Sequence, residues 1–535
     1  MTSGETGDMN LAAGSSGKLE KAGVTRDAGK RHLPHETLVR LSDYLERYMG
    51  LFYPQKKWND LERQIMKSLA DFNFSDSEAF VDWLLSSVPP TRNQIEILAS
   101  YLTIGETYFF REKQVFEILE KQIFPELIGA RRGNERRLRI WSAGCCTGEE
   151  PYSIAILLSR MLPDWKDWNI SILATDINTR FLQKASEAIY SPWSFRDCPS
   201  WVKEGYFRKS KEDQFEILPE VKKMVTFSYL NLVEDTYPSL SSQTNAMDMI
   251  FCRNVLMYFS EETVKGVVSN LSRCLVEGGW MVTSPSESQY VPSASFAAVR
   301  FPNVVLYRKG SKGKKLKEIP HAFPSLPFEE TAASAGPRVD PVPKRDAAPV
   351  RVTKPVKRLE AKEKEAERAP PYLKAQALYE QGRYGEAIQE LLELVSQKQN
   401  TVKVLSLLAR VHANQGELME ALKWCERAIV LDKLVSELHY LRATILQEQG
   451  DMEEAVMSLK RAIYLDPDFA LAHFAMGVLN SRRGQFKEAD KHFKNVLMLL
   501  KKCRQEETLP ESDGITAGRL CEIVGLISQG RGPHA

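Results

Sequence analysis

The stretch Arg139-Ile-Trp-Ser-Ala-Gly-Cys-Cys-Thr-Gly-Glu-Glu-Pro-Tyr-Ser-Ile-Ala-Ile156 decides the fold of this 535-residue chain. Its apolar start predicts a short buried strand from Leu138 to Trp141, its two glycines a tight loop, and the run from Pro151 a helix. Proline suits the first helical turn, because the N–H groups there have no partner within the helix. A strand, a glycine loop and a helix in this order bring a ligand against backbone N–H groups and the positive end of the helix dipole. The stretch therefore predicts an α/β domain that binds a nucleotide-like cofactor.

The loop residues argue against two common phosphate-binding motifs. A dinucleotide fingerprint needs G-x-G-x-x-G, whereas only Gly144 and Gly148 are glycine here, and a Walker loop needs a lysine where Glu149 stands. Glu149 and Glu150 place negative charge where a polyphosphate would be repelled. A cationic or hydroxyl-rich ligand fits better, and S-adenosylmethionine has a sulfonium and an amino group. The alternative is that the glycines only shape a turn.

Two further apolar segments end in polar residues. A second strand is predicted for Ile170-Ser-Ile-Leu-Ala-Thr-Asp176. A third strand is predicted for the segment Met247-Asp-Met-Ile-Phe-Cys-Arg-Asn254. An acid at the end of the second strand of such a sheet accepts hydrogen bonds from ribose hydroxyls, and ligands bind at the carboxyl ends of the strands. We therefore expect Glu149, Asp176, Arg253 and Asn254 to meet in one crevice.

Four segments, in order and at familiar spacing, resemble the CheR-type chemoreceptor glutamate methyltransferases. They are Thr103–Glu112, Gly144–Ser153, Ala174–Asn178 and Phe251–Phe259. The resemblance covers residues 35–308 and implies a doubly wound S-adenosylmethionine-dependent methyltransferase fold behind an N-terminal helical domain. It also implies methylation of glutamate side chains on chemoreceptors (methyl-accepting chemotaxis proteins), which gives γ-methyl esters in a chemotaxis-like signalling pathway.

The resemblance implies cofactor contacts at eight positions. These are Thr107, Arg111, Glu149, Asp176, Asn231, Leu232, Arg253 and Asn254. Cys146 stands where a serine is expected, and Gly105 where some members have asparagine. Both departures affect only local contacts, because a thiol is a weak hydrogen-bonding group and glycine has no side chain to donate.

The catalytic residues are not identified by the sequence. A glutamate carboxylate is already ionised at neutral pH, so no general base is expected. Arg111, Arg253 and Tyr258 are candidates for orienting the substrate. The two arginines could instead bind the cofactor's own carboxylate or form an ion pair with Glu149 or Glu150. Tyr258 could instead lie in the core. The neighbouring Phe109 and Phe110 lie either under the adenine or in the core.

The chain in front of the linker is expected to form two domains after a disordered N-terminus at residues 1–31, which have few large apolar groups. Helical apolar spacing predicts an N-terminal helical domain at 32–105, which either only covers the catalytic domain or, by the resemblance, helps to recognise substrate. The methyltransferase domain is expected at 106–309. Aromatic and basic residues between 189 and 230 look like the small β-subdomain of the family, without the glycine-flanked loop that binds a receptor tail in some relatives.

The C-terminal part is expected to be a repeat solenoid behind a Pro-rich linker at 310–368. Glycines recur every 34 residues and small residues stand seven positions before each, which is typical of tetratricopeptide repeats (TPRs). The glycines are Gly382, Gly416, Gly450 and Gly484, and the small residues are Ala375, Ala409, Ala443 and Gly477. We expect four repeats at 369–502 and a possible capping helix and tail at 503–535. The linker predicts a boundary with few crossing contacts.

The repeats predict that a protein or peptide docks on the concave face of the solenoid. Three candidates stay open, which are a receptor tail, another signalling protein and the chain's own catalytic domain. Two other functions are alternatives to receptor methylation. One is a TPR scaffold with an inactive methyltransferase domain, and the other is methylation of a small metabolite.

Composition restricts the function classes. With 72 Lys and Arg against 70 Asp and Glu, the chain has almost no net charge, so nucleic acid is not an expected partner. Eight cysteines without a C-x-x-C pair indicate reduced thiols, and the scattered histidines predict no metal site. The chain has no apolar run of membrane-spanning length and no apolar signal core. We therefore expect a cytoplasmic protein that meets a membrane only through receptors.

Overall fold

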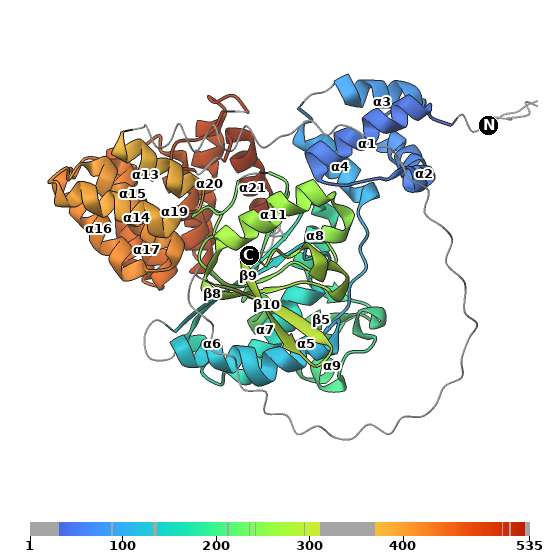
Figure 1. Ribbon diagram of the computed structural model, residues 1–535, viewed down its shortest axis with the longest axis horizontal. Helices are drawn as coiled ribbons and strands as arrows, with labels where there is room; N and C mark the ends of the chain where they lie inside the picture. The colour runs from blue at the N-terminus through green and yellow to red at the C-terminus, as the bar shows by residue number, and fades with distance from the viewer. Residues whose placement is uncertain are drawn as a thin grey trace, which may run out of the picture.

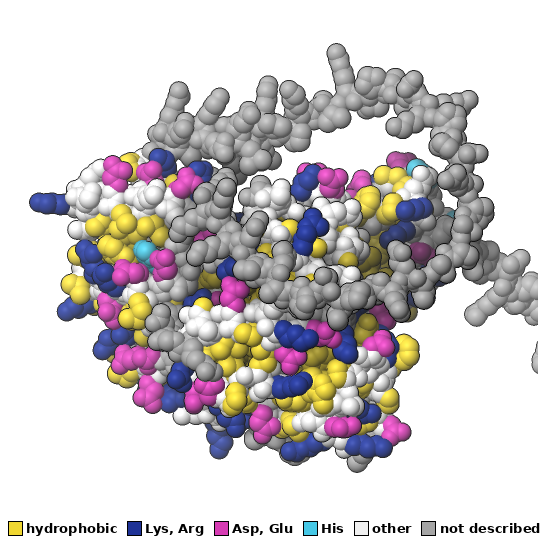
Figure 2. Space-filling view, turned by 60° about the horizontal axis from the view of Figure 1, so that its bottom comes forward, with side chains coloured by type: hydrophobic (Ala, Val, Ile, Leu, Met, Phe, Trp, Pro, Cys, Tyr) yellow, Lys and Arg dark blue, Asp and Glu magenta, His cyan; other side chains and the backbone are white. Residues whose placement is uncertain are grey.

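The computed structural model describes three regions that lie against one another: a helical front domain, a central sheet domain and a helical repeat region (Figure 1). Charged side chains of both signs are interspersed over the face shown in Figure 2. Among the described residues, no helix is both long and apolar enough to cross a membrane. The described residues are 32–86, 89–131, 136–210, 213–234, 236–240, 242–293, 295–310, 370–505, 507–512 and 515–529. The expected disordered N-terminus and Pro-rich linker lie outside them.

The front domain is a small helical unit with its own core. It consists of α1 (His35–Met49), α2 (Trp58–Ser68), α3 (Ser77–Ser86) and α4 (Arg92–Leu102). α1 ends at Gly50, whose φ of 72° is the left-handed conformation that favours glycine. α4 begins with a capping box between Thr91 and Gln94. Leu41 and Phe80 are fully buried among the helices.

A seven-stranded sheet forms the centre of the molecule, and it contains the three strands that the sequence predicts. Its strands, in order across the sheet, are β6 (Val225–Tyr229), β2 (Asn169–Asp176), β1 (Arg137–Ala143), β7 (Met247–Phe251), β8 (Leu275–Val282), β10 (Val304–Lys309) and β9 (Phe296–Phe301). Strands β6 to β8 are parallel, whereas β10 and β9 are antiparallel to their neighbours. Helices α5 (Lys113–Ile118) and α6 (Phe124–Arg131) precede β1.

Helices cover both faces of this sheet, so the predicted doubly wound fold is confirmed. Alternate residues of β1 point to opposite faces. Ile140 packs in one core with α7 (Glu149–Met161), and Trp141 packs in another with α11 (Glu261–Cys274). The helix after β2 is α8 (Thr179–Glu187), which begins at the capping residue Asn178.

A second, smaller sheet lies beside the main one. Its antiparallel strands, in order, are β3 (Ile189–Tyr190), β5 (Phe215–Ile217) and β4 (Phe207–Lys209). In sequence, α9 (Ser200–Tyr206) precedes β4, and α10 (Pro219–Lys222) follows β5. The run 225–230, which we grouped with the β-subdomain, does not join this sheet. Its residues form β6, the edge strand of the main sheet, because they pair in parallel with β2 from Ile172 to Asp176.

The repeat region has the predicted period. Gly382, Gly416, Gly450 and Gly484 all have positive φ and lie between the two helices of each pair. The small Ala409 and Ala443 are fully buried where the paired helices approach closely. The helices of residues 370–500 are α13 (Pro371–Glu380), α14 (Tyr384–Ser396), α15 (Val402–Gln415), α16 (Leu418–Leu431), α17 (Ser436–Gln449), α18 (Met452–Leu465), α19 (Ala470–Arg482) and α20 (Phe486–Leu500).

The repeat region lies directly against the sheet domain (Figure 1). Our expectation of few crossing contacts is therefore wrong. The physical reason is that two arginines at the start of β1, Arg137 and Arg139, are buried and find a carboxylate partner on α17. A last helix, α21 (Ala517–Gln529), packs on α20, and its Arg519 donates to the backbone oxygen of Tyr229 on the edge strand β6.

Candidate functional site

A cavity of roughly 1050 Å³, open to solvent on one side, lies at the carboxyl ends of β1, β2 and β7. This is where ligands bind in open α/β sheets. The front domain supplies part of its wall through Met49, Leu51 and Leu102. Seven of the eight predicted cofactor positions line it, namely Thr107, Arg111, Asp176, Asn231, Leu232, Arg253 and Asn254.

The glycine loop after β1 is held tightly against the neighbouring strands. The N–H groups of Gly144 and Cys145 both donate to the backbone oxygen of Thr175, at 2.8 and 2.9 Å. Gly144 has a φ of 82°, and a Cβ added to it would lie 2.3 Å from a methyl group of Val255. Only glycine therefore fits at position 144, so this glycine does more than shape a turn.

Replacing Gly144 with alanine is expected to weaken binding of the demethylated cofactor by at least tenfold. The new Cβ collides with Val255 and strains a backbone that favours glycine, which costs about 1–3 kcal/mol. Calorimetric titration measures the effect. Gly129→Ala on α6 is the matched control, because a Cβ there meets nothing within 4 Å. Equal affinity in the two variants would show that the loop does not shape the site.

Asp176, at the end of β2, combines a buried carboxylate with backbone hydrogen bonds. Its two oxygens accept from the N–H groups of Cys146 and Asn178 at 2.8 and 2.9 Å. Burial raises the pKa of Asp176 from 3.8 to about 6, although the backbone N–H groups act in the opposite direction. The side chain is therefore charged at pH 7 and lines the cavity, where it is suited to accept hydrogen bonds from hydroxyl groups.

Arg253 is already paired with carboxylates. Its guanidinium contacts Glu150 at 2.9 Å and Glu112 at 3.0 Å, and it donates to the backbone oxygen of Arg111. Burial alone lowers the pKa of Arg253, and the two carboxylates raise it above its usual value. Arg253 could bind a ligand carboxylate or form an ion pair with Glu149 or Glu150, and in the structure it forms the ion pair with Glu150.

Arg111 is placed differently. Its guanidinium lines the cavity and donates to the backbone oxygen of Glu106 at 2.5 Å. Among the residues that the structure describes, no carboxylate forms an ion pair with Arg111. Its charge also acts on Tyr258: burial raises the pKa of that phenol, and Arg111 opposes the shift. Of the two arginines, Arg111 is the one available to an anionic ligand.

Glu149 is the predicted cofactor position that does not line the cavity. It is buried, accepts hydrogen bonds from Thr147 at 2.6 Å and Ser194 at 3.1 Å, and burial raises its pKa. Its neighbour Glu150 lines the cavity instead and accepts from Ser142. Glu149 therefore holds the start of α7 against the segment that carries Ser194.

Asn231 and the aromatic candidates divide between the cavity and the core. Asn231 donates to the backbone oxygen of Tyr48 at 2.8 Å, which ties the cavity wall to the front domain. Tyr258 lines the cavity. Phe109 and Phe110 do not line it, and both are buried in the main core, so the core alternative holds for them.

Glu287 is a residue of the site that we did not predict. It is fully buried and accepts hydrogen bonds from the N–H groups of Asn254 at 2.7 Å, Val255 at 2.7 Å and Met257 at 3.3 Å. These bonds fix the turn after β7, where Asn254 has a φ of 58°. The sequence signal is the capping box Ser284-Pro-Ser-Glu287, which begins a short helical turn.

The groups around the cavity suit S-adenosylmethionine. Asp176 offers a carboxylate to ribose hydroxyls, and Phe181 and Val255 offer apolar surface to a base. Glu150, which is paired with Arg253, adds a second carboxylate to the lining. Burial and the nearby carboxylates raise the pKa of the Cys146 thiol to about 12, which keeps this thiol protonated at neutral pH. Among the described side chains, no group of three His, Cys, Asp or Glu could hold a metal ion.

Comparison with known proteins agrees with this geometry. The family model described as CheR methyltransferase, SAM binding domain matches residues 105–301, and two tetratricopeptide models match 372–433 and 443–484. A chemotaxis protein methyltransferase of Vibrio cholerae is 30% identical over 275 residues, which are 51% of this chain and 93% of that protein. One of Borreliella burgdorferi is 31% identical over 260 residues, 48% of this chain and 89% of its own. A probable biofilm formation methyltransferase of Pseudomonas aeruginosa is 28% identical and matches over 48% of this chain and 58% of its own. The chain therefore belongs to the CheR family of chemotaxis protein methyltransferases, with TPRs at its C-terminal end.

Proposed function

We propose that this methyltransferase acts on glutamate side chains of chemoreceptors and gives γ-methyl esters. Membership of the family makes the chain an S-adenosylmethionine-dependent methyltransferase of chemotaxis-like signalling, and the accepting group is the part that we propose. One observation carries the proposal. Arg111, with no carboxylate partner among the described residues, lies in the cavity beside Tyr258 and can orient an anionic group.

The residues of the cavity match the demands of this chemistry. The bound cofactor supplies an electrophilic methyl group on a sulfonium, and the acceptor is a carboxylate that is ionised at neutral pH, so the chain need not remove a proton. The task that remains is alignment and exclusion of water, which contributes at most about 7–11 kcal/mol. Met49 and Leu51 of the front domain supply apolar wall for this purpose.

We assign the cofactor contacts within the cavity as follows. Asp176 accepts from the ribose hydroxyls, and Arg111 binds either the cofactor's carboxylate or that of the substrate. Glu150 takes the cofactor contact that the resemblance implies for Glu149, since Glu149 accepts from Thr147 and Ser194 instead. The remaining contacts come from Thr107, Asn231, Leu232, Arg253 and Asn254.

Replacing Arg111 with methionine is expected to lower kcat/KM by about ten- to 150-fold. A hydrogen bond to a charged group contributes about 1.5–3 kcal/mol, which corresponds to that range. Steady-state rates on a receptor fragment measure the loss. Calorimetry with the demethylated cofactor then identifies the carboxylate: an equal loss of affinity points to the cofactor, and unchanged affinity points to the substrate. Unchanged kcat/KM would remove Arg111 from the site. Arg208→Met, at an exposed position of β4, is the control.

The reaction itself is tested with methyl-labelled cofactor and a purified cytoplasmic fragment of a chemoreceptor. We expect label on the receptor that base releases as methanol, because carboxyl esters are base-labile. Base-stable label would point to another acceptor atom, and label only in small molecules to a metabolite enzyme. A chain that neither binds cofactor nor transfers label would be a TPR scaffold with an inactive methyltransferase domain. In the proposed function the repeats also dock a protein partner.

A further inference from the structure

The face of the repeat region formed by the first helix of each pair, called the inner face here, is turned toward the rest of the chain. Such a face lines the concave side of a solenoid, which is the usual binding surface. Arg410 on α15, Glu448 on α17 and Arg482 on α19 all lie on it, and each contacts a residue outside the repeats. The surface where a partner is expected is therefore in contact with this chain itself.

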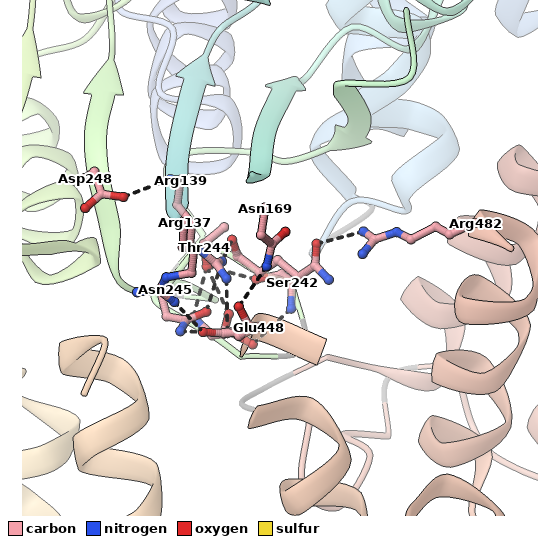
Figure 3. A network of polar contacts seen from close by, with 11 residues as sticks. Arg137, Arg139, Asn169, Ser242, Thr244, Asn245, Asp248, Glu448 and Arg482 are labelled. Carbon is pink, nitrogen blue, oxygen red and sulfur yellow. Dashed lines mark hydrogen bonds and ion pairs between the residues drawn. The ribbon is translucent and has the colours of Figure 1, made fainter. Parts of the chain in front are cut away.

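Glu448 is the centre of these contacts (Figure 3). Its carboxylate lies 3.4 Å from the guanidinium of Arg137 and 3.2 Å from that of Arg139, and it accepts from the side chain of Asn245 at 3.0 Å. Its backbone oxygen accepts from Asn169 at 2.9 Å. One repeat residue thus contacts the beginnings of β1 and β2 and the loop before β7.

These contacts are buried. The side chains of Arg137, Arg139 and Glu448 are 2%, 6% and 4% exposed. Removing one partner from a buried ion pair is costly, because the other charge is left without compensation. An uncharged side chain at position 448 would therefore take from two buried guanidinium groups the carboxylate that they share.

A loop of the catalytic domain extends the contact along the inner face. Leu240 is 5% exposed and packs in the core cluster of the first repeats, beside residues such as Leu408. Gln243 bonds on both sides of the interface, since its backbone oxygen accepts from Arg139 and its side-chain oxygen accepts from Arg482 at 3.2 Å. Apolar packing and polar pairing thus come from one short segment, residues 236–240 and 242–246.

The turns of the first two repeats also approach the catalytic domain closely. A Cβ added to Gly382 would lie 2.4 Å from the side chain of Arg273, and one added to Gly416 would lie 3.0 Å from Arg137. The segment after α20 covers part of the remaining inner face, where Glu511 forms an ion pair with Arg410.

We propose that the inner face of the TPR region is an intramolecular binding site whose ligand is the chain's own methyltransferase domain, with Glu448 as the central contact. A protein partner that needs this face has to displace the catalytic domain first. The contacts lie at the amino ends of the strands, whereas the cofactor cavity lies at their carboxyl ends, so this association leaves the cavity open. The inference refines the proposed docking role of the repeats. The experiment that tests it measures the association of the two regions and not methyl transfer. The inference and the proposed methylation of receptors can therefore fail separately.

The test uses the full chain with a protease recognition sequence inserted near residue 340. In the sequence, this position lies between the methyltransferase domain and the repeats. After cleavage of the otherwise unchanged chain, we expect both pieces to elute together from a sizing column at micromolar concentration. In the Glu448→Arg variant we expect them to separate, with at least about thirtyfold weaker association, because a third positive charge meets two buried arginines. Glu453→Arg is the matched control, since Glu453 lies exposed on α18 of the same repeat pair.

Binding of the demethylated cofactor by the cleaved Glu448→Arg variant checks that its catalytic piece is folded. Leu240→Ser, on the catalytic side of the interface, should weaken the association of the two pieces independently of Glu448. Separation of the cleaved but otherwise unchanged chain would overturn the proposal. It would equally be overturned if Glu448→Arg and Glu453→Arg stayed associated to the same extent.

Discussion

Replacing Asp176 with alanine is expected to weaken binding of the demethylated cofactor by ten- to several-hundred-fold. The carboxylate lies at the end of β2 and lines the cavity, where we expect two ribose hydroxyls to donate to it. Each hydrogen bond to a charged group contributes about 1.5–3 kcal/mol. Calorimetric titration of the purified chain measures the loss, and Asp213→Ala, at an exposed turn, is the control. An unchanged affinity would remove Asp176 from the cofactor site.

From the raised pKa of Asp176 we expect that cofactor affinity and the free energy of unfolding depend on pH in opposite directions. Because burial raises the pKa of Asp176 from 3.8 to about 6, the folded chain holds this proton more tightly than the unfolded chain. Its contribution to the free energy of unfolding is therefore largest below about pH 4 and is lost as the pH rises to 6. Cofactor affinity should instead fall as the pH is lowered through 6, because a neutral carboxyl accepts hydroxyl groups less well. The Asp176→Ala variant should lack this part of the pH dependence.

Replacing Glu287 with alanine is expected to destabilise the methyltransferase domain by about 4 kcal/mol or more and to abolish tight cofactor binding. The carboxylate is fully buried and accepts from the N–H groups of Asn254, Val255, Met257 and Ser284. Each buried donor left without a partner costs about 1–3 kcal/mol. The turn after β7 would lose its left-handed conformation at Asn254, and with it one wall of the cavity.

Chemical denaturation and calorimetry measure the two effects of the Glu287 change. Glu287→Gln is expected to lie between the parent chain and Glu287→Ala, because it keeps one acceptor oxygen and points an amide donor at N–H groups. Glu262→Ala, exposed on α11, should stay within about 0.5 kcal/mol of the parent chain. If Glu287→Ala retained both stability and cofactor affinity, the turn would not depend on this carboxylate.

Local patterns in the sequence were sufficient for three central strands of the main sheet and for the repeats. The loop at Gly144, the acid at Asp176 and the 34-residue spacing of the turn glycines each follow from backbone constraints that a short segment expresses by itself. The position of β6 did not follow, because an apolar run such as 225–229 can pair with either sheet. Only its register against Ile172 and its neighbours decides between them.

The side chains of the cavity were predictable by position but less so by role. Burial and partner choice depend on residues far apart in the chain, such as Arg253 with Glu112 and Glu150. Glu287 carried a local signal in its capping box, yet its bonds to the turn after β7 appear only in three dimensions. The contact of Glu448 with Arg137 joins residues 311 positions apart, which no pattern within either region indicates.

The edge strand β6 has a consequence for how shortened forms of this chain will behave. On one side it pairs with β2, and on the other α21 brings Arg519 to the backbone oxygen of Tyr229. An uncovered strand edge is a template for pairing with another molecule. A chain cut before α21 should therefore self-associate, and its poor recovery or altered kinetics would report aggregation through β6 rather than a lost regulatory function of the repeats.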